Sequence, residues 1–423
     1  MATGPDGNGR RPRVLVLGGG FAGIGAAQKL KKSDIEVVVV DKHDYHTFKP
    51  LLYQVATGLL DQPAVGHPIR DLFHDQDNAR IHQDRVTSID LDAREVTFGE
   101  LEPLTYDYLV FGLGAESNFF GVEGAAEHAF PLHTLPDAVR LKNHVLRTWE
   151  KADKRPELVG DGALNMVIVG GGPTGIETAG AMAELYNSVF RKDYPDMPRG
   201  QARIILVEAG PELFPMFKAD IRAYAEKALA KRGVEAMTGE VVESITPRRV
   251  TLESGTVLPA HTLVWGAGLQ GNELVQSLGL ELEQGNRIGV DEELRIPGHP
   301  EVYAVGDVAA ITDQKRNQVL PQLGSVALQA GEHVGKTIAG RIAGKETKPF
   351  KYRDKGTMAT IGRGSAVVQM LGGRTIKGKA ASLAWGTVHL ALLPTNGDRA
   401  KAVVDWAGAG LTHQRSARIT VET

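Results

Sequence analysis

The stretch that decides the fold is residues 13–23, RVLVLGGGFAG. Its first five residues predict a short buried strand, and its glycines predict a tight turn into a helix over 24–31. A second strand over 35–40 ends on Asp41. A strand, a Gly-x-Gly-x-x-Gly turn, a helix, a strand and an acid, in this order, predict a dinucleotide-binding Rossmann unit.

Each residue type in this turn has a chemical reason. Gly18 allows the tight turn, Gly20 lets the backbone approach a pyrophosphate, and Gly23 lets the helix pack closely on the strand. The helix N-terminus offers free N–H groups to the phosphates, and the carboxylate of Asp41 can accept hydrogen bonds from a ribose. The candidate ligand-binding positions of this first unit are Gly18, Gly20, Phe21, Ala22, Gly23, Asp41 and Lys42.

The same pattern occurs a second time. Residues 165–175, NMVIVGGGPTG, predict a strand and a glycine turn, followed by a helix over 176–185. The next strand, over 202–207, ends on Glu208 after a polar insertion at 186–201, which predicts a helix extension and a loop. A carboxylate at this point accepts from a ribose 2′-hydroxyl and repels a 2′-phosphate, which favours NADH over NADPH. The candidate positions here are Gly170, Gly172, Pro173, Thr174, Gly175 and Glu208. Two such units suggest two dinucleotides, FAD held and NAD(P)H visiting.

Three further strands end in glycine turns. Residues 106–115 (YDYLVFGLGA) and 261–268 (HTLVWGAG) would each return the chain to a nucleotide fold. Residues 301–309 (EVYAVGDVA) deliver a glycine and a carboxylate that can bind a polyol, although an aspartate capping the next helix is an open alternative. The candidate positions are Gly114, Ala115, Gly268, Gly306 and Asp307.

Composition excludes several kinds of chemistry. The chain has 48 Lys and Arg against 51 Asp and Glu, a formal net charge of −3, which predicts no nucleic-acid partner. It contains no cysteine, which excludes disulfides, thiolate metal sites and dithiol redox chemistry. No histidine motif predicts a metal site. The polar start, 1–12, predicts a disordered leader of a cytoplasmic protein, and no apolar run reaches the ~20 residues that span a bilayer.

Longer segments carry a family resemblance. They are VLVLGGGFAGIGAA (14–27), DKHDYHTFKPLLYQVATG (41–58), VIVGGGPTGIETAGAMAEL (167–185), IILVEAGPELFP (204–215), YAVGDVA (303–309), YRDKGTMATIGR (352–363) and LTHQRSARI (411–419). With these segments the chain resembles the flavoproteins with two dinucleotide-binding domains, and within them the type II NADH dehydrogenases, which are NADH:quinone oxidoreductases. The resemblance covers nearly the whole chain after the leader. It implies FAD in the first unit, with Asp41 and Asp307 on its sugar and ribityl groups, NADH in the second, and a quinone as acceptor.

The resemblance also implies roles for residues around the flavin. A helix that starts near 321–324 and runs to 333 would direct backbone N–H groups of Leu323 and Gly324 at the ring edge. Glu177 would line the nicotinamide–flavin contact, although a first-turn carboxylate that complements the helix dipole is an alternative. Tyr53, with Gln54, would line the flavin or the second substrate's path, the alternative being plain buried packing. Glu177 and Gln329 are the candidate catalytic residues.

Two departures from the family concern the acceptor and the membrane. The family's glutamine-rich helix motif has Ser325 and Ala330 here in place of two of its three glutamines. The C-terminal helices, expected over 380–393 and 399–411 around a turn at 396–398, are only mildly apolar. They predict peripheral contact with the inner face of the cell membrane, or packing within the protein or across a homodimer.

Other functions stay open from the residues alone. A soluble NADH-dependent reductase could pass electrons to a ferredoxin or rubredoxin. A flavin-binding sensor would not need the second nucleotide unit.

The sequence thus predicts an α/β protein with two Rossmann-like domains. The FAD domain, 13–125 and 295–345, is interrupted by an NADH domain, 126–294. A C-terminal region, 346–423, carries the helices expected at a membrane or dimer contact.

Overall fold

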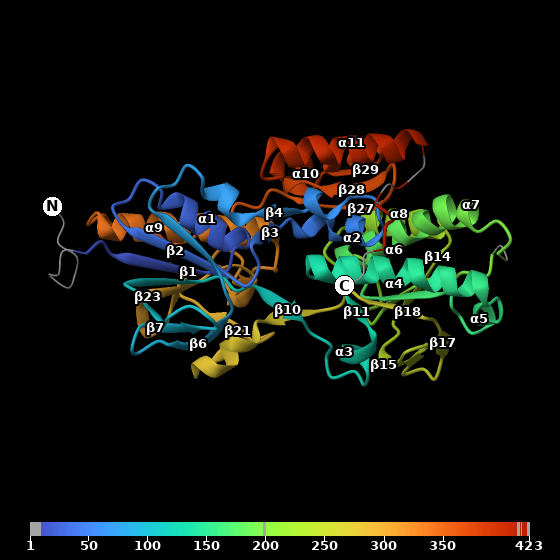
Figure 1. Ribbon diagram of the computed structural model, residues 1–423, viewed down its shortest axis with the longest axis horizontal. Helices are drawn as coiled ribbons and strands as arrows, with labels where there is room; N and C mark the ends of the chain where they lie inside the picture. Colours follow the sequence, from blue (N-terminus) through green and yellow to red (C-terminus); the bar gives the residue numbers. More distant parts are fainter. Residues whose placement is uncertain (1–9, 198–199, 413–414, 416, 421–423) are drawn as a thin grey trace. The chain divides into compact units, whose positions relative to one another are not determined.

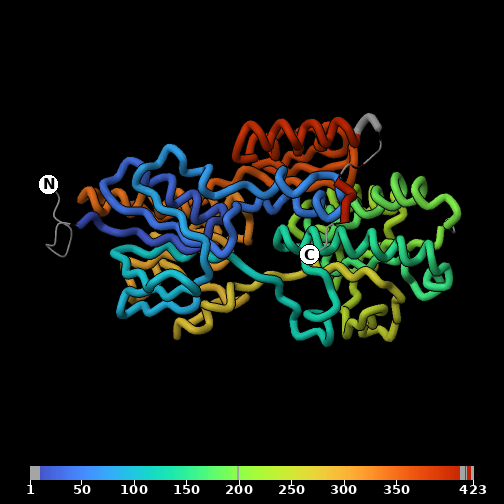
Figure 2. The backbone as a smooth tube through the Cα atoms, viewed as in Figure 1, coloured from blue at the N-terminus to red at the C-terminus, as the bar shows by residue number. Residues whose placement is uncertain are grey.

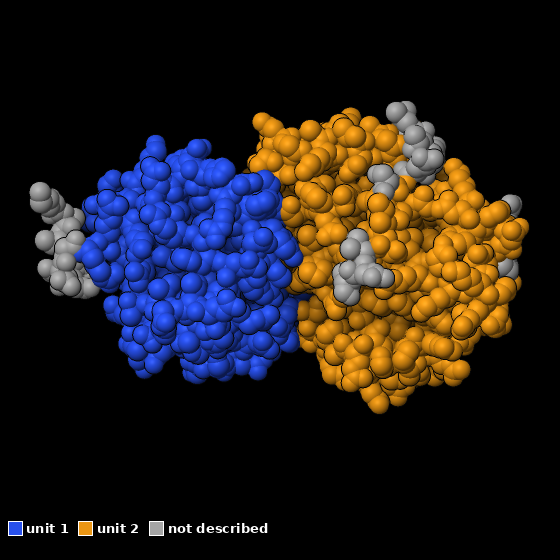
Figure 3. Space-filling model, viewed as in Figure 1, with its two compact units in different colours: residues 1–46, 67–116, 269–353 blue, residues 47–66, 117–268, 354–423 orange. Residues whose placement is uncertain are grey.

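A computed structural model describes residues 10–197, 200–412, 415 and 417–420; the side chains of 410–412 are outside this description. The chain divides into two compact units, which Figure 3 colours separately. Unit 1 comprises 1–46, 67–116 and 269–353, and unit 2 comprises 47–66, 117–268 and 354–423. Residues 1–9 of the expected leader lie outside the described residues.

Unit 1 is built on a sheet with the strand order β22-β23-β9-β1-β2-β5. Its strands are β1 (Arg13–Leu17), β2 (Glu36–Asp41), β5 (Ala79–Gln83), β9 (Tyr108–Phe111), β22 (Arg295–Ile296) and β23 (His299–Ala304). All neighbours are parallel except β22 and β23. The parallel strands are buried on both faces, so they read as runs of valine and leucine rather than as an alternating pattern.

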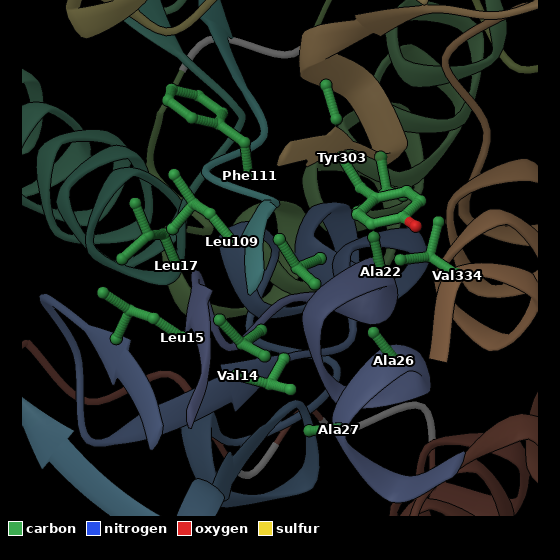
Figure 4. Close-up of a cluster of buried hydrophobic side chains, with 14 of the residues drawn as sticks. Val14, Leu15, Leu17, Ala22, Ala26, Ala27, Leu109, Phe111, Tyr303 and Val334 are labelled. Carbon is green, nitrogen blue, oxygen red and sulfur yellow. The ribbon is translucent and has the colours of Figure 1, made fainter. Parts of the chain in front are cut away.

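Two helices of unit 1 cross at very short range. They are α1 (Phe21–Lys29) and α9 (Gly324–Ile342), which lie side by side as blue and orange segments in Figure 2. A Cβ on Gly331 would lie 1.9 Å from the carbonyl oxygen of Ala22, and one on Gly335 would lie 2.3 Å from that of Ala26. Figure 4 shows Ala22, Ala26 and Val334 in the core formed with β1 and β9. Only small residues permit this approach, so the contact fixes the position of α1 relative to α9.

Smaller strands and short helices complete unit 1. An antiparallel sheet contains β6 (Val86–Asp90), β7 (Glu95–Phe98) and β8 (Leu104–Thr105). The remaining pieces are η3 (Ile69–Phe73), η5 (Glu273–Leu278), β20 (Leu282–Glu283), β21 (Arg287–Gly289), η6 (Gly306–Val308), β24 (Ala309–Ala310), β25 (Thr312–Asp313) and β26 (Gln318–Val319). The short strands β3 (Tyr45–Thr47), β4 (Gly66–Pro68), β10 (Ala115–Ser117) and β19 (Leu269–Gly271) lie where the chain passes from one unit to the other.

Unit 2 contains a second parallel sheet, in the order β11-β18-β12-β13-β14. Its strands are β11 (Phe130–Pro131), β12 (Met166–Val169), β13 (Ile204–Glu208), β14 (Val234–Thr238) and β18 (Thr262–Trp265). Its helices include α4 (Leu135–Lys154), α6 (Pro173–Leu185) and α8 (Ala219–Ala230). An antiparallel sheet follows, with β15 (Val242–Thr246), β16 (Arg249–Leu252) and β17 (Val257–Pro259). Shorter helices are η1 (Lys49–Leu51), α2 (Leu52–Ala56), η2 (Gln62–Ala64), α3 (Ala125–His128), α5 (Glu157–Gly160), η4 (Tyr186–Phe190) and α7 (Arg191–Asp193).

The C-terminal region belongs to unit 2 from Asp354 on and is not only helical. It begins with an antiparallel sheet of β27 (Thr357–Gly362), β28 (Ser365–Gln369) and β29 (Thr375–Gly378), with η7 (Leu371–Gly373) between the last two. The helices α10 (Lys379–Leu392) and α11 (Asn396–Thr412) follow, and Figure 1 shows them beside these strands. A Cβ on Gly180 would lie 2.4 Å from the carbonyl oxygen of Ile361, so α6 packs directly on β27.

The two Rossmann-like sheets confirm the predicted fold class, while several element boundaries were wrong. The helices begin at Phe21 and Pro173, so Gly23 and Gly175 lie inside helices rather than in the turns. The expected turn at 396–398 is the first turn of α11. Thr395 accepts a hydrogen bond from the Asp398 N–H, and the Asp398 carboxylate accepts from the Thr395 N–H, a reciprocal cap that starts a helix.

The compact units also differ from the expected domain boundaries. Residues 47–66 and 354–423 group with the second sheet, and 269–294 group with the first. The contacts of α6 with β27, and of α2 with α4 and α6, explain the first difference. Among the residues described, no helix is both long and apolar enough to cross a membrane.

Candidate functional site

The glycine turn of unit 1 has the geometry of a ligand cradle. Gly18 has φ +102°, and a Cβ there would lie 2.3 Å from the carbonyl oxygen of Gly112. A Cβ on Gly23 would lie 1.8 Å from the carbonyl oxygen of Gly18. Gly20 is different, because a Cβ there would meet no atom of the described chain within 4 Å. The fold therefore requires glycine at positions 18 and 23, whereas Gly20 leaves open space where a ligand could approach.

Asp41 lies at the end of β2 and faces this turn. Its Oδ2 accepts from the Gly19 N–H at 2.6 Å, and its Oδ1 accepts from the His43 N–H at 2.7 Å. The carboxylate therefore holds the turn in shape, with lone pairs left over for a ribose hydroxyl. Lys42 is exposed beside it.

Three segments that are far apart in the sequence meet at the start of α1. Gly306, with φ +76°, lies so close that its Cβ would be 3.1 Å from Cβ of Ala22. A Cβ on Gly324 would lie 3.3 Å from the ring of Phe21. Gln322 donates to the carbonyl oxygen of Asp307 at 2.9 Å, which ties the start of α9 to η6. The structure thus brings the predicted residues of all three segments together.

The starts of α1 and α9 are suited to anionic groups of a ligand. No side chain in the described part of the chain caps α1 at Gly20 or α9 at Leu323. An uncapped N-terminus combines unpaired donors with the positive end of the helix dipole, so it favours anionic ligand groups. Gly114, with φ +74°, and Ala115 lie beyond β9, and a Cβ on Gly114 would also meet no described atom within 4 Å.

Unit 2 contains a second glycine turn with nearly the same geometry. Gly170 has φ +109°, and its Cβ would lie 2.9 Å from the backbone of Ala267. A Cβ on Gly175 would lie 1.8 Å from the carbonyl oxygen of Gly170, while one on Gly172 would lie in space free of the described atoms. Glu208 repeats the part of Asp41, since its carboxylate accepts from the N–H groups of Gly171 and Gly210. Each of the two units therefore contains a glycine turn of the same geometry, held by its own carboxylate.

The start of α6 completes the second site. Pro173 occupies the first turn, where its missing N–H leaves no bond unmade, and Thr174 is exposed beside it. No side chain of a described residue caps this helix at Gly172. Gly268, with φ +67°, follows β18, the neighbour of β12 in the sheet.

Glu177 lies in α6, in a largely buried polar cluster of unit 2. Its Oε1 accepts from the Thr360 N–H at 3.1 Å. Burial raises the pKa of the Glu177 carboxyl to about 8, because the charged form loses solvation, and the Thr360 hydrogen bond opposes this rise. The side chain therefore holds a proton at neutral pH and can release it to a base, which suits proton transfer.

Tyr53 lies in the same cluster. It is buried, and its hydroxyl accepts a hydrogen bond from Nε2 of Gln54 at 2.8 Å. Burial, and then the carboxylate of Glu177, raise the pKa of the Tyr53 hydroxyl well above its usual value. The phenol therefore stays protonated across the physiological range.

Sequence reasoning missed the groups that hold this cluster in place. Arg415 is buried, donates to the carbonyl oxygen of Thr57 at 2.9 Å and lies 3.7 Å from the carboxylate of Glu184. Burial lowers the pKa of the Arg415 guanidinium to about 10, and Glu184 opposes this shift. The only signal was that Arg415 lies in one of the family-like segments, and nothing in the sequence pairs it with residues more than 200 positions earlier.

Two predicted acceptor-side residues have partners within unit 1. Gln329 donates to the carbonyl oxygen of Arg353 at 3.1 Å and accepts from the Arg353 N–H at 3.0 Å. The Ser325 hydroxyl lies 2.9 Å from the hydroxyl of Tyr352. Ala330 is fully buried. These contacts use the polar groups of both side chains for packing α9. Among the described residues, no cluster of His, Asp or Glu could hold a metal ion.

Fold and sites together define a protein with two dinucleotide-binding units. A family model described as pyridine nucleotide-disulphide oxidoreductase matches residues 12–331. The type II NADH:quinone oxidoreductase Ndh of Mycobacterium tuberculosis is 34% identical, with 96% of this chain and 89% of that protein covered. The mitochondrial internal alternative NAD(P)H-ubiquinone oxidoreductase A1 of Arabidopsis thaliana is 30% identical, with 95% and 84% covered. The structure of NDH2 from Plasmodium falciparum in complex with NADH shares the fold, with a TM-score of 0.89, 20% identity, and 98% and 100% covered.

This chain belongs to the type II NADH:quinone oxidoreductases, within the pyridine nucleotide-disulphide oxidoreductase family.

Proposed function

We propose that this protein oxidises NADH and reduces a membrane quinone, with FAD carrying the electrons between them. The balanced reaction is NADH + H⁺ + quinone → NAD⁺ + quinol. The observation that carries the proposal is the pair of matched glycine turns, each with its own carboxylate, in two separate units. The names of the curated relatives favour a quinone over a ferredoxin or rubredoxin as acceptor.

The residues of unit 1 fit FAD. The open face of Gly20 and the uncapped start of α1 would receive its pyrophosphate, and Asp41 would bind its ribose. Asp307 would bind the ribityl chain, while Phe21, Ala22, Gly23, Lys42, Gly114 and Ala115 would line the cofactor. When bound, FAD supplies a ring that accepts two electrons from a nicotinamide and gives them to a second acceptor. The backbone N–H groups of Leu323 and Gly324, at the start of α9, would stabilise negative charge on that ring.

Unit 2 would receive NADH. Gly172 and the start of α6, with Pro173 and Thr174, would face its pyrophosphate, and Glu208 would accept from its ribose hydroxyls. A 2′-phosphate would meet the negative charge of Glu208, so we expect NADH to be used in preference to NADPH. Gly268, beyond β18 on the opposite side of β12 from Glu208, would lie towards the nicotinamide half.

Glu177 is the proposed proton donor in this reaction. Reduction of a quinone to a quinol consumes two protons, and the pKa of Glu177, raised to about 8, keeps a proton available at neutral pH. Gln329 is the second proposed catalytic residue. Its amide would have to leave the backbone of Arg353 before it could bind a quinone, so we expect a smaller contribution from it.

Membrane contact is proposed through α10 and α11. Val403 and Val404 of α11 are exposed, as are Leu383 and Leu392 of α10. Trp385 and Leu393 of the same region are buried. An exposed apolar surface on neighbouring helices suits the interfacial region of a bilayer. Location at the inner face of the cell membrane stays a prediction that cell fractionation tests. Assembly into a homodimer stays a prediction that light scattering tests.

The test is steady-state turnover of the purified protein. Its released chromophore is identified by mass spectrometry, and NADH oxidation is followed with and without a short-chain quinone. The proposal expects FAD and NADH oxidation that depends on the quinone, with quinol as product. A protein that retains FAD and oxidises NADH with ferricyanide, but forms no quinol, would contradict the quinone as acceptor.

A further inference from the structure

A chain of hydrogen bonds connects the C-terminal helix α11 to Tyr53. Nε1 of Trp406 donates to Oε1 of Gln54 at 2.7 Å. Nε2 of Gln54 then donates to the hydroxyl oxygen of Tyr53 at 2.8 Å. Gln54 is 3% exposed and Tyr53 is 6% exposed, so water cannot readily replace either partner. All three residues belong to unit 2.

The direction of this chain is fixed by Trp406. An indole nitrogen can only donate a hydrogen bond, so the Gln54 oxygen must face it. The NH₂ group of Gln54 must then face Tyr53 and donate to the phenol oxygen. As a result the hydroxyl hydrogen of Tyr53 points away from Gln54 and is available to an acceptor. Without the indole N–H, the Gln54 amide could turn over and take that hydrogen itself.

The surroundings of Tyr53 suit a neutral donor. Burial and the nearby carboxylates of Glu177 and Glu184 raise the pKa of its hydroxyl, while hydrogen bonds from Gln54 and Thr360 only partly oppose this. The hydroxyl therefore keeps its proton and can donate a hydrogen bond at any physiological pH. On α9, by contrast, Ser325 and Gln329 already bond to Tyr352 and Arg353.

We propose that Trp406 is a positioning residue that, through Gln54, directs the Tyr53 hydroxyl at a carbonyl oxygen of the quinone. This inference rests on the proposed function and adds a donor for its second substrate. A quinone carbonyl accepts hydrogen bonds only, so it discriminates between the two directions of the chain. Tyr53 polarises the carbonyl and keeps its own proton. The helix that carries Trp406 also carries the exposed Val403 and Val404, so the donor is set by the helix proposed to lie on the membrane.

The test uses Trp406→Phe, which keeps an aromatic ring beside Trp385, 5.8 Å away, and removes the N–H. Trp385→Phe is the matched control, because the buried Nε1 of Trp385 has no hydrogen-bond partner among the described residues. For each variant, kcat and KM for a short-chain quinone are measured at saturating NADH. The rate of flavin reduction by NADH is measured separately by anaerobic stopped flow.

We expect Trp406→Phe to lower kcat/KM for the quinone about five- to tenfold, mainly through KM, as for loss of one oriented hydrogen bond. Flavin reduction by NADH should keep its wild-type rate, and Trp385→Phe should keep the wild-type kcat/KM. Adding Trp406→Phe to Tyr53→Phe should cause no further loss, because Trp406 acts through Tyr53. If Trp406→Phe does not fold, Gln54→Met tests the same link and should show the same defect.

Two results would overturn the inference. One is a wild-type quinone KM in Trp406→Phe, and the other is a loss that is equally large in the Tyr53→Phe background. If the unmodified protein forms no quinol although NADH reduces its flavin, the proposed function fails and the inference fails with it. If the unmodified protein does form quinol, a null effect of Trp406→Phe refutes the inference alone.

Discussion

Alanine at Gly20 or Gly172 should separate cofactor binding from folding. Both glycines have extended backbones that alanine can adopt, with φ −80° at Gly20 and −79° at Gly172. The added Cβ would meet no described atom within 4 Å in either case. Alanine should therefore leave stability unchanged or raise it by ~0.4–1 kcal/mol, because it restricts the unfolded chain.

Ligand binding should suffer where stability does not. A pyrophosphate that contacts the backbone at these positions would collide with the new methyl group. Overpacking of one methyl group costs ~1–3 kcal/mol, which is roughly a 5- to 150-fold loss of affinity. Gly20→Ala should lower FAD affinity, and Gly172→Ala should raise the Kd for NADH without changing FAD content.

The assay combines three measurements on each variant. The melting temperature of the protein stripped of flavin reports folding, flavin absorbance per chain reports FAD, and anaerobic titration reports NADH. Gly175→Ala is the control for a steric clash inside the fold, since its Cβ would lie 1.8 Å from the Gly170 carbonyl and should destabilise the protein. A Gly172→Ala variant that binds NADH like the wild type would contradict this prediction, as would a Gly20→Ala variant whose melting temperature falls as much as that of Gly175→Ala.

Three other predictions concern pH, packing and the membrane. The folded-state pKa of Glu177 is raised to about 8, so the unfolded chain loses this proton at lower pH than the folded one. The free energy of unfolding therefore falls between about pH 4.5 and 8 by up to ~1.4 kcal/mol per pH unit, and Glu177→Gln should remove this contribution. Chemical denaturation at pH 5.5 and 7.5 measures the effect. The same change in unfolding free energy between these two pH values in both proteins would contradict the prediction. Gly331→Ala places a Cβ 1.9 Å from the Ala22 carbonyl oxygen, so α1 and α9 must separate and the free energy of unfolding should fall by more than ~3 kcal/mol. The exposed change Gly344→Asn is the control and should have little effect. A melting temperature of Gly331→Ala close to that of the wild type would count against this packing. Leu383→Asp with Val404→Asp should reduce co-sedimentation with anionic vesicles while leaving NADH:ferricyanide turnover intact, and undiminished sedimentation would show that α10 and α11 are not the contact.

Local patterns predicted the parts of the fold that local chemistry determines. The strands before Gly18 and Gly170 and the acids Asp41 and Glu208 all lie where their spacing indicates. The structural role of Asp41 and Glu208 was not predictable. Each carboxylate accepts a hydrogen bond from the N–H of Gly19 or Gly171, and this contact exists only once the turn has closed. A ribose acceptor and a structural hydrogen-bond acceptor look the same in a sequence.

Helix limits depended on packing that a sequence does not display. The helix expected to end at 333 continues to Ile342, through Gly335 and Gly340. Glycine lowers helix propensity by ~1 kcal/mol, but here Gly335 allows the close contact with α1 that outweighs this cost.

The polar cluster around Tyr53 shows the same limit more strongly. The sequence singles out Tyr53, Gln54 and Glu177 as individual residues, each of which could also be ordinary packing or helix capping. Trp406, which bonds Gln54, and Arg415, which bonds Thr57, come from the C-terminal region, and only the folded chain brings them to this cluster. Pairing at such sequence separation leaves no periodic signal.

The proposed path of electrons from NADH through FAD to a quinone is tested most directly by an anaerobic sequence of additions to the purified protein. We predict that NADH bleaches the flavin absorbance and that a short-chain quinone then restores it, over repeated cycles, with one quinol formed per NADH. A flavin that NADH leaves oxidised would contradict the assignment of the two dinucleotide sites. A flavin that bleaches and then stays reduced in excess quinone would contradict the assignment of the acceptor.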